Sequence, residues 1–332
     1  MHYVGVDLHK HTLVIAVENA HGPIGRPVTI RCRETEKIVA SFEGLRPFRA
    51  VIEASGSYRW LYDLLASRGE VVLAHPRRLK AIVEGRAKTD KRDAALLAKL
   101  LRVEMIPMAY VPPRRYQELR DLCRARARLA RHATQAKNEL HAVLTRRNIH
   151  PPFKTPFCRG WIRFVADLDL GFVGNATRDE ALRRWDHYRR EIETLDLALS
   201  KAAASFPEVP AIMEIPGIGL FSALLIIGGA RGAVALPRCA AGGGLFGIDA
   251  ARGPVGRPLP SRIDHAPGLA VAALGVGAGG DEGPQKDKAL ANFYTRVRKR
   301  SSAKIARVAV ARKLAEICWI RLRRHHRMKE AA

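Results

Sequence analysis

Through the first hundred residues, short apolar runs alternate with polar and glycine-containing turns. Apolar runs of this length, bounded by glycine, proline or polar residues, are typical of β-strands. Longer stretches in which apolar residues return every three or four positions predict helices. The predicted strands are residues 4–7, 12–17, 28–31, 48–53 and 71–74, and the predicted helices are 37–43, 60–68 and 90–103. This alternation predicts an α/β region in which helices pack on a mixed sheet that opens with an antiparallel meander.

A long helix is predicted after residues 111–113 (VPP), because apolar positions then recur at alternating spacings of three and four. These positions form a heptad seam: Leu119, Leu122, Arg126, Leu129, Ala133, Ala136, Leu140 and Val143. Only Arg126 interrupts the seam with a charge. One interpretation is a coiled coil that dimerises while its outer face contacts phosphates, and the other is a solvated helix of a monomeric bundle.

Arginines lie between the seam positions of this helix. Arg124, Arg128 and Arg131 are the candidates for contact with nucleic-acid phosphates. An irregular stretch is expected at 153–160, followed by a second helical arm at 177–205. Residues 111–206 are therefore predicted to form a coiled-coil-like helical middle region between an α/β domain, 1–110, and a mainly α-helical C-terminal domain, 207–332.

The segment 212–223 (IMEIPGIGLFSA) has a proline–glycine turn between two apolar flanks. Such a turn is typical of a helix-hairpin-helix, in which glycines let the backbone approach phosphates and the second helix binds them through N–H groups. Pro216, Gly217 and Gly219 are therefore candidate nucleic-acid-binding residues. The alternative is a tight turn between helices that binds nothing. Further on, residues 233–283 are rich in glycine, alanine and proline and lack periodicity, whereas 289–299 and 302–324 predict basic helices.

The charge of the chain indicates a polyanionic partner. Its 57 lysines and arginines against 32 acidic residues give a formal net charge of +25. A solubility feature or an arginine-biased genome would be the alternative explanation, but the charge is clustered as well as large. The cysteines show no metal-ligand spacing, and no apolar run is long enough for a membrane span. We expect a cytoplasmic, nucleoid-associated protein that binds DNA.

Four acidic residues stand where a metal-dependent nuclease would place carboxylates. Asp7 and Glu53 end apolar runs, and Asp90 and Asp93 open a predicted helix. Carboxylates gathered by folding can share Mg²⁺, or Mn²⁺ in its place, which offsets their repulsion and polarises a phosphodiester. The alternative for Asp90 and Asp93 is that they only stabilise the helix N-terminus.

These segments resemble the insertion-sequence transposases of the IS110 type, which are DEDD recombinases with a RuvC-like domain. The resemblance is carried by residues 4–10 (VGVDLHK), 53–58 (EASGSY) and 88–94 (KTDKRDA), with 215–219 (IPGIG) and 293–314 matching the C-terminal domain. It implies an RNase H-type fold, Mg²⁺ on the four acids, a coiled-coil contact between protomers of a homodimer or larger homo-oligomer, and a separate transposase domain. It also implies a structured guide RNA as a partner beside DNA.

The resemblance further implies a serine nucleophile in the C-terminal domain, and here the sequence departs from the family. Val255 stands where a serine is expected, and Ser261 could replace it only if the loop is threaded differently. Two rival functions therefore stay open. One is a nuclease resembling a Holliday-junction resolvase that uses the same acids, and the other is a decayed transposase that binds nucleic acid without catalysis.

Overall fold

The computed structural model of the chain describes residues 1–83, 89–234 and 288–330. The chain divides into two compact units, Met1–Val111 and Pro112–Ala332. Each unit is described by itself below, under the names first unit and second unit. The further division of the second unit at residue 206 stays a prediction.

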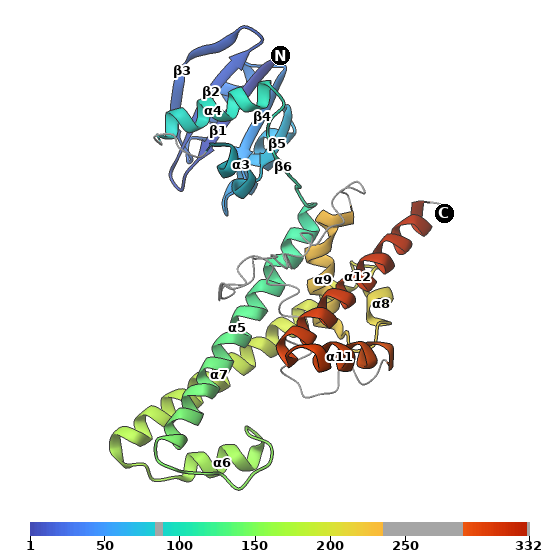
Figure 1. The fold of residues 1–332 in the computed structure, drawn as a ribbon. Coiled ribbons are helices and arrows are strands. Elements are labelled where there is room, and N and C mark those ends of the chain that lie inside the picture. The colour runs from blue at the N-terminus through green and yellow to red at the C-terminus, as the bar shows by residue number, and fades with distance from the viewer. Residues whose placement is uncertain (84–88, 235–287, 331–332) are drawn as a thin grey trace. The chain divides into compact units, whose positions relative to one another are not determined.

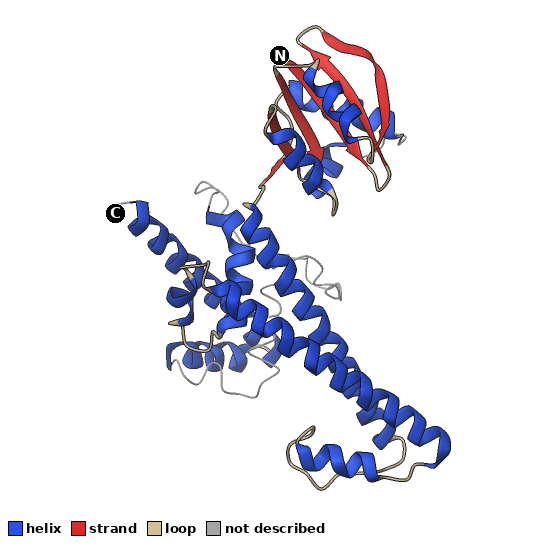
Figure 2. Cartoon of the chain, turned by 180° about the vertical axis from the view of Figure 1, so that it is seen from behind, coloured by secondary structure: helices blue, strands red, loops and turns tan. Residues whose placement is uncertain are grey.

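Strands of the first unit form a mixed sheet, as the sequence predicts (Figures 1 and 2). The meander of β1, β2 and β3 is antiparallel, while β1, β4 and β5 run parallel. Among the described residues the strand order is β3-β2-β1-β4-β5-β6. The strands are β1 (His2–Leu8), β2 (Thr12–Asn19), β3 (Gly22–Arg31), β4 (Phe48–Glu53), β5 (Glu70–Ala74) and β6 (Met108–Ala109). The two-residue β6 is too short to leave a periodic signal, and the sequence did not predict it.

Helices cover both faces of this sheet because side chains of a strand alternate between the two faces. Val6 and Ile52 point to one face and join a core with α1 (Thr35–Glu43) and α2 (Tyr58–Ala66). On the other face, Val51 packs with α3 (Pro76–Val83) and α4 (Asp90–Arg102). Helix α3 was not predicted, since His75-Pro76 suggested only the end of a strand; proline is, however, well tolerated in the first turn of a helix.

Two long helices lie side by side in the second unit (Figure 1). They are α5 (Arg114–Thr145) and α7 (Gly171–Ala203). They run antiparallel, because Arg126 pairs with Asp196 while Glu139, further along α5, pairs with Arg184, which comes earlier on α7. In the sequence between these two helices lies α6 (Arg159–Asp167), which buries Trp161 and begins within the stretch expected to be irregular. The second arm also begins earlier than the predicted residue 177.

Two of the other described helices of the second unit, α8 and α12, pack against α9 (Leu220–Val234), which is nearly all apolar, and α11 packs against α12. The bounds of these three helices are Val209–Met213 for α8, Lys288–Arg300 for α11 and Ala303–Glu330 for α12. The core of this group joins Tyr116 and Leu119 of α5 to α9 and α12. No helix among the described residues is long and apolar enough to cross a membrane.

The heptad seam of α5 is covered by the chain itself. Its N-terminal part packs against α9, and its C-terminal part, including Leu140, packs with α6 and α7. Arg126, the charged interruption, donates two hydrogen bonds to Asp196 of α7, at 3.0 and 3.1 Å, and lies 4.4 Å above the Phe221 ring of α9. The charge therefore occurs in the seam because this position meets an acid and an aromatic ring.

Candidate metal centre

Two neighbouring parallel strands place Asp7 and Glu53 at the same level of the sheet. Val6 of β1 lies opposite Ile52 of β4, so the next residue of each strand is one of the two acids. Both acids follow residues that face α1 and α2, so they point to the opposite face, where α4 lies. The pairing of the strands thus fixes the positions of two of the four acids, Asp7 and Glu53.

Helix α4 brings the other two acids to this face. It is capped by Thr89, whose side chain accepts a hydrogen bond from the Arg92 N–H, and its first turn carries Asp90 and Asp93. Residues three and four apart share a helix face. Asp90 and Asp93 are therefore on the side of α4 that, one turn later, packs Ala94 against the sheet.

Gly5 lets α4 approach β1 closely. A Cβ at this position would lie 2.0 Å from the Ala94 carbonyl oxygen and 2.5 Å from the Ala98 nitrogen, both of them backbone atoms. At the other end of α4, Arg102 pairs with the buried Glu18 of β2 at 2.7 Å. The helix is thus held against the sheet along its length, and this fixes the position of its N-terminal acids.

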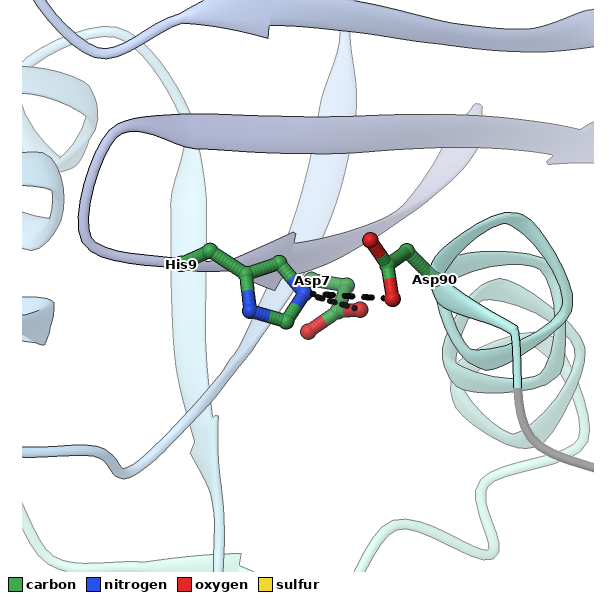
Figure 3. Close-up of side chains that lie close together, drawn as sticks. All are labelled: Asp7, His9 and Asp90. Atoms are coloured by element: carbon green, nitrogen blue, oxygen red, sulfur yellow. Dashed lines mark hydrogen bonds and ion pairs between the residues drawn. The ribbon is translucent and has the colours of Figure 1, made fainter.

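Asp7, His9 and Asp90 form a compact group in which one ligand atom from each lies within 4.8 Å of the others (Figure 3). The His9 Nε2 atom is 3.1 Å from Asp7 Oδ2 and 3.4 Å from Asp90 Oδ1. Glu53 and Asp93 are not in this group of three, although Asp93 is near enough to act on the charge of Asp7. That all four acids bind one metal stays a prediction.

The pKa of Asp7 is raised above its ordinary value. Burial is the largest cause, and the negative charges of Asp90 and Asp93 act in the same direction, while the charge and hydrogen bond of His9 oppose them. Among the described residues, no lysine or arginine forms an ion pair with Asp7, Asp90 or Asp93. In a chain of net charge +25, the imidazole of His9 is thus the one basic group that pairs with these acids in the described part of the chain.

His9 is the member of this group that sequence reasoning missed. It stands two residues after Asp7, in the turn that joins β1 to β2, and its backbone N–H bonds to the Thr12 carbonyl at 2.9 Å. The signal was available, because a histidine so close to a candidate ligand is held near it by the chain.

The predicted nucleic-acid contacts lie in the second unit. Arg124, Arg128 and Arg131 are exposed on α5, and none of them pairs with an acid in the described part of the chain. Pro216, Gly217 and Gly219 are exposed in the turn between α8 and α9. Gly217 has a φ of +85°, a conformation that favours glycine.

The expected nucleophile position and the cysteines are the remaining residues considered in the sequence. Val255 and Ser261 lie outside the described residues, so the position of the expected nucleophile stays a prediction. Of the cysteines, Cys123 and Cys318 are buried in the core of the second unit. Burial raises the pKa of both thiols to about 12, so they are unreactive at neutral pH.

Comparison with known proteins identifies a family for the N-terminal part of the chain. Residues 4–149, which contain all four, match the family of IS110-type DEDD transposases, described simply as "Transposase". Residues 4–149 belong to this family. The matched segment of this chain covers nearly all of the first unit and the whole of α5.

Two curated proteins of Sinorhizobium fredii are also similar to the chain. "Putative transposase y4qE" is 26% identical over 175 residues, which are 50% of this chain and 44% of that protein. "Putative transposase y4pF/y4sB" is 26% identical over 234 residues, which are 68% of this chain and 57% of that protein. The chain thus spans about half the length of these relatives.

Proposed function

We propose that the protein is a DNA transposase or recombinase of an insertion sequence, which cleaves and exchanges DNA strands with the help of a divalent cation. The IS110-type family of residues 4–149 and the transposase names of the two relatives support this reaction class. The first unit would carry the cation centre on an RNase H-type, RuvC-like sheet. The basic helices of the second unit would hold nucleic acid.

The observation that carries the proposal is the group of Asp7, Asp90 and Asp93, which form no ion pair with a lysine or arginine of the described residues. Asp7 and Asp90 offer oxygen donors of the kind Mg²⁺ and Mn²⁺ bind, and the raised pKa of Asp7 reflects burial and repulsion that a cation would relieve. In this proposal Glu53 and Asp93 would complete the donor set. When bound, the cation would polarise a phosphodiester and stabilise the charge that develops on its oxygens.

The charge of the second unit supports a nucleic-acid partner. Arg124, Arg128 and Arg131 follow one face of α5 at spacings of four and three, so their unpaired guanidinium groups can contact successive phosphates. The turn at Pro216–Gly219 would act as the hairpin of a helix-hairpin-helix, with N–H groups of the first turn of α9 donating to a phosphate. A structured guide RNA beside the DNA remains part of the proposal.

A homodimer or larger homo-oligomer also remains part of the proposal. The heptad seam of α5 is already covered by α7 and α9, so a second copy would need other apolar residues. Phe172 and Val173, which are 90% and 73% exposed at the start of α7, are apolar and available for such a contact.

The proposal is tested by incubating the full chain with Mg²⁺ and branched or element-end DNA. Asp7→Asn and Asp90→Asn should abolish strand cleavage and leave DNA binding largely intact, because each removes a donor charge and little volume. Asp63→Asn is the matched control, since Asp63 lies on α2 and pairs with Arg59. Cleavage that survives Asp7→Asn would contradict the proposal.

A second candidate function is favoured by Val255. Without a serine nucleophile, the same acids would give a structure-specific nuclease resembling a junction resolvase. The products of the same incubation separate the two functions. Covalent protein–DNA adducts would support the recombinase, free nicked strands the nuclease, and binding without products a decayed, non-catalytic copy.

A further inference from the structure

His9 approaches the two acids as closely as ligands of one ion approach each other. Donors bound at about 2.0–2.2 Å lie about 3 Å apart in an octahedral site and about 3.5 Å apart in a tetrahedral one. The two contacts of His9 Nε2, 3.1 Å to Asp7 and 3.4 Å to Asp90, fall in this range. One ion placed between the three atoms would therefore reach all of them without a large movement of the chain (Figure 3).

The turn that carries His9 is fixed on both sides of the residue. Its backbone N–H donates to the Thr12 carbonyl, and its own carbonyl accepts a bond from the Cys32 Sγ at 3.6 Å. These contacts tie the turn to the start of β2 and to the end of β3. A ligand on such a support needs little ordering when it binds an ion.

Hydrogen bonding alone explains the two contacts of His9 less well than metal binding does. A single ring nitrogen carries at most one proton, so Nε2 can give one of the two carboxylates a full hydrogen bond. A cation at the same place would contact the nitrogen and both carboxylates at once.

We propose that His9 is a nitrogen ligand of the cation held by Asp7 and Asp90, and that it makes this centre favour Mn²⁺ over Mg²⁺. The inference rests on the proposed cation-dependent function and adds a ligand and an ion preference to it. Mg²⁺ binds proteins mainly through oxygen and keeps several waters, whereas imidazole suits the transition metals. A centre of carboxylates alone would discriminate less between the two ions.

The test is Mn²⁺ binding to the full chain, followed by electron paramagnetic resonance, with competition by Mg²⁺. Electron spin-echo measurements detect a nitrogen nucleus bonded directly to Mn²⁺. We expect this nitrogen signal in the unmodified protein and not in His9→Ala. We also expect Mn²⁺ affinity to fall on the order of tenfold or more in the variant, and Mg²⁺ affinity to fall less.

Two further variants make the result specific to His9. His11→Ala is the matched control, because His11 is an exposed histidine of the same turn, and it should keep the nitrogen signal. His9→Gln keeps a side chain able to hydrogen-bond the acids but offers no imidazole, and it also covers the case in which His9→Ala does not fold. If hydrogen bonding were the role of His9, His9→Gln would keep the original ratio of Mn²⁺ to Mg²⁺ affinity.

The outcomes separate this inference from the proposed function. Bound Mn²⁺ without a nitrogen signal, or an unchanged affinity ratio in both His9 variants, would overturn the role of His9 and leave a carboxylate centre standing. A protein that binds neither ion would overturn both the role of His9 and the cation-dependent function.

Discussion

Asp186 on α7 of the second unit and Asp7 in the first unit have opposite surroundings. On α7, Asp186 accepts hydrogen bonds from Arg189 and Arg190, and the bond from Arg189 is the largest cause of its lowered pKa. In the first unit, Asp7 has an imidazole and two further acids around it, and burial raises its pKa. Arginine neutralises Asp186 on α7 and also acids of the first unit such as Glu18 and Asp63, whereas no described lysine or arginine forms an ion pair with Asp7, Asp90 or Asp93.

This contrast separates acids whose surroundings explain them by stability alone from acids that are candidates for function. Ion pairs one helical turn apart stabilise a solvated helix slightly, and they need no partner from outside. A group of acids that raises the pKa of one of its members costs folding energy, and such groups occur mainly at functional sites. The two kinds of acid differ in surroundings rather than in residue type.

The largest effect is expected from Gly5→Ala, which disturbs the position of the acids in the first unit. The new Cβ would lie within van der Waals radii of two α4 backbone atoms, so α4 must move away from β1. We expect the free energy of unfolding of the first unit to fall by at least about 3 kcal/mol, the upper end of ordinary overpacking. DNA cleavage should fall with it, because Asp90 moves with the helix. Chemical denaturation and the cleavage assay measure the two effects.

Gly219→Ala is the matched glycine of the second unit. A Cβ there meets no described atom within 4 Å, and its φ is not in the left-handed range. The change should leave stability within about 0.5 kcal/mol of the original. Equal losses in the two variants would mean that the close approach at Gly5 is not what positions α4.

Charge reversal on α5 comes next in size. Changing Arg124, Arg128 and Arg131 to Glu should weaken nucleic-acid binding on the order of a hundredfold near physiological salt and flatten the dependence of affinity on salt by about 0.9 per lost phosphate contact. Fluorescence anisotropy at several salt concentrations measures both. The same reversal at Lys154, Arg159 and Arg163, exposed elsewhere in the second unit, controls for net charge. Equal slopes in the two variants would place the contact surface elsewhere.

A smaller effect is expected at the charged position of the seam. Arg126→Ala removes the stacking on Phe221, the packed side-chain stem and two hydrogen bonds to Asp196. Because the Asp196 side chain is 42% exposed, solvent screens the ion pair and most of the loss comes from stacking and packing. Thermal and chemical unfolding should report a loss of about 1–2 kcal/mol. An unchanged stability would leave the charge in the seam without a structural reason.

The sequence predicts what depends on near neighbours and misses what depends on distant ones. Strand alternation and helical spacing locate β1, β4, α4 and α5, because those patterns are local. The α5 seam packs against α7 because the chain reverses its direction between these two helices, in the segment that contains α6. No local pattern specifies that reversal. The role of Gly5 likewise appears only when Ala94, far along the chain, lies against it.

The candidate site divides in the same way. Asp7 and Glu53 are marked by the ends of apolar runs, and Asp90 and Asp93 by the start of a helix, so the sequence offers all four as candidates, and the structure brings Asp7 and Asp90 into one compact group. His9 has no such mark, since it lies in a turn where an exposed histidine is ordinary. Only the fold shows that Asp90 meets it.

The smallest effect is expected from Asp7→Asn on the metal-free protein, and it is a gain in stability. The pKa of folded Asp7 is raised, so its contribution to stability is fully present below the pKa of the unfolded chain and is lost as pH rises through the folded pKa. At neutral pH the amide removes a buried charge and its repulsion by Asp90 and Asp93. The variant should therefore be more stable than the original at neutral pH, and the difference should shrink towards about pH 4. Denaturation in metal-free buffer at the two pH values measures it. Adding Mg²⁺ should stabilise the original protein and not the variant. If the variant is less stable than the original in metal-free buffer, Asp7 is a structural acid like those of α7.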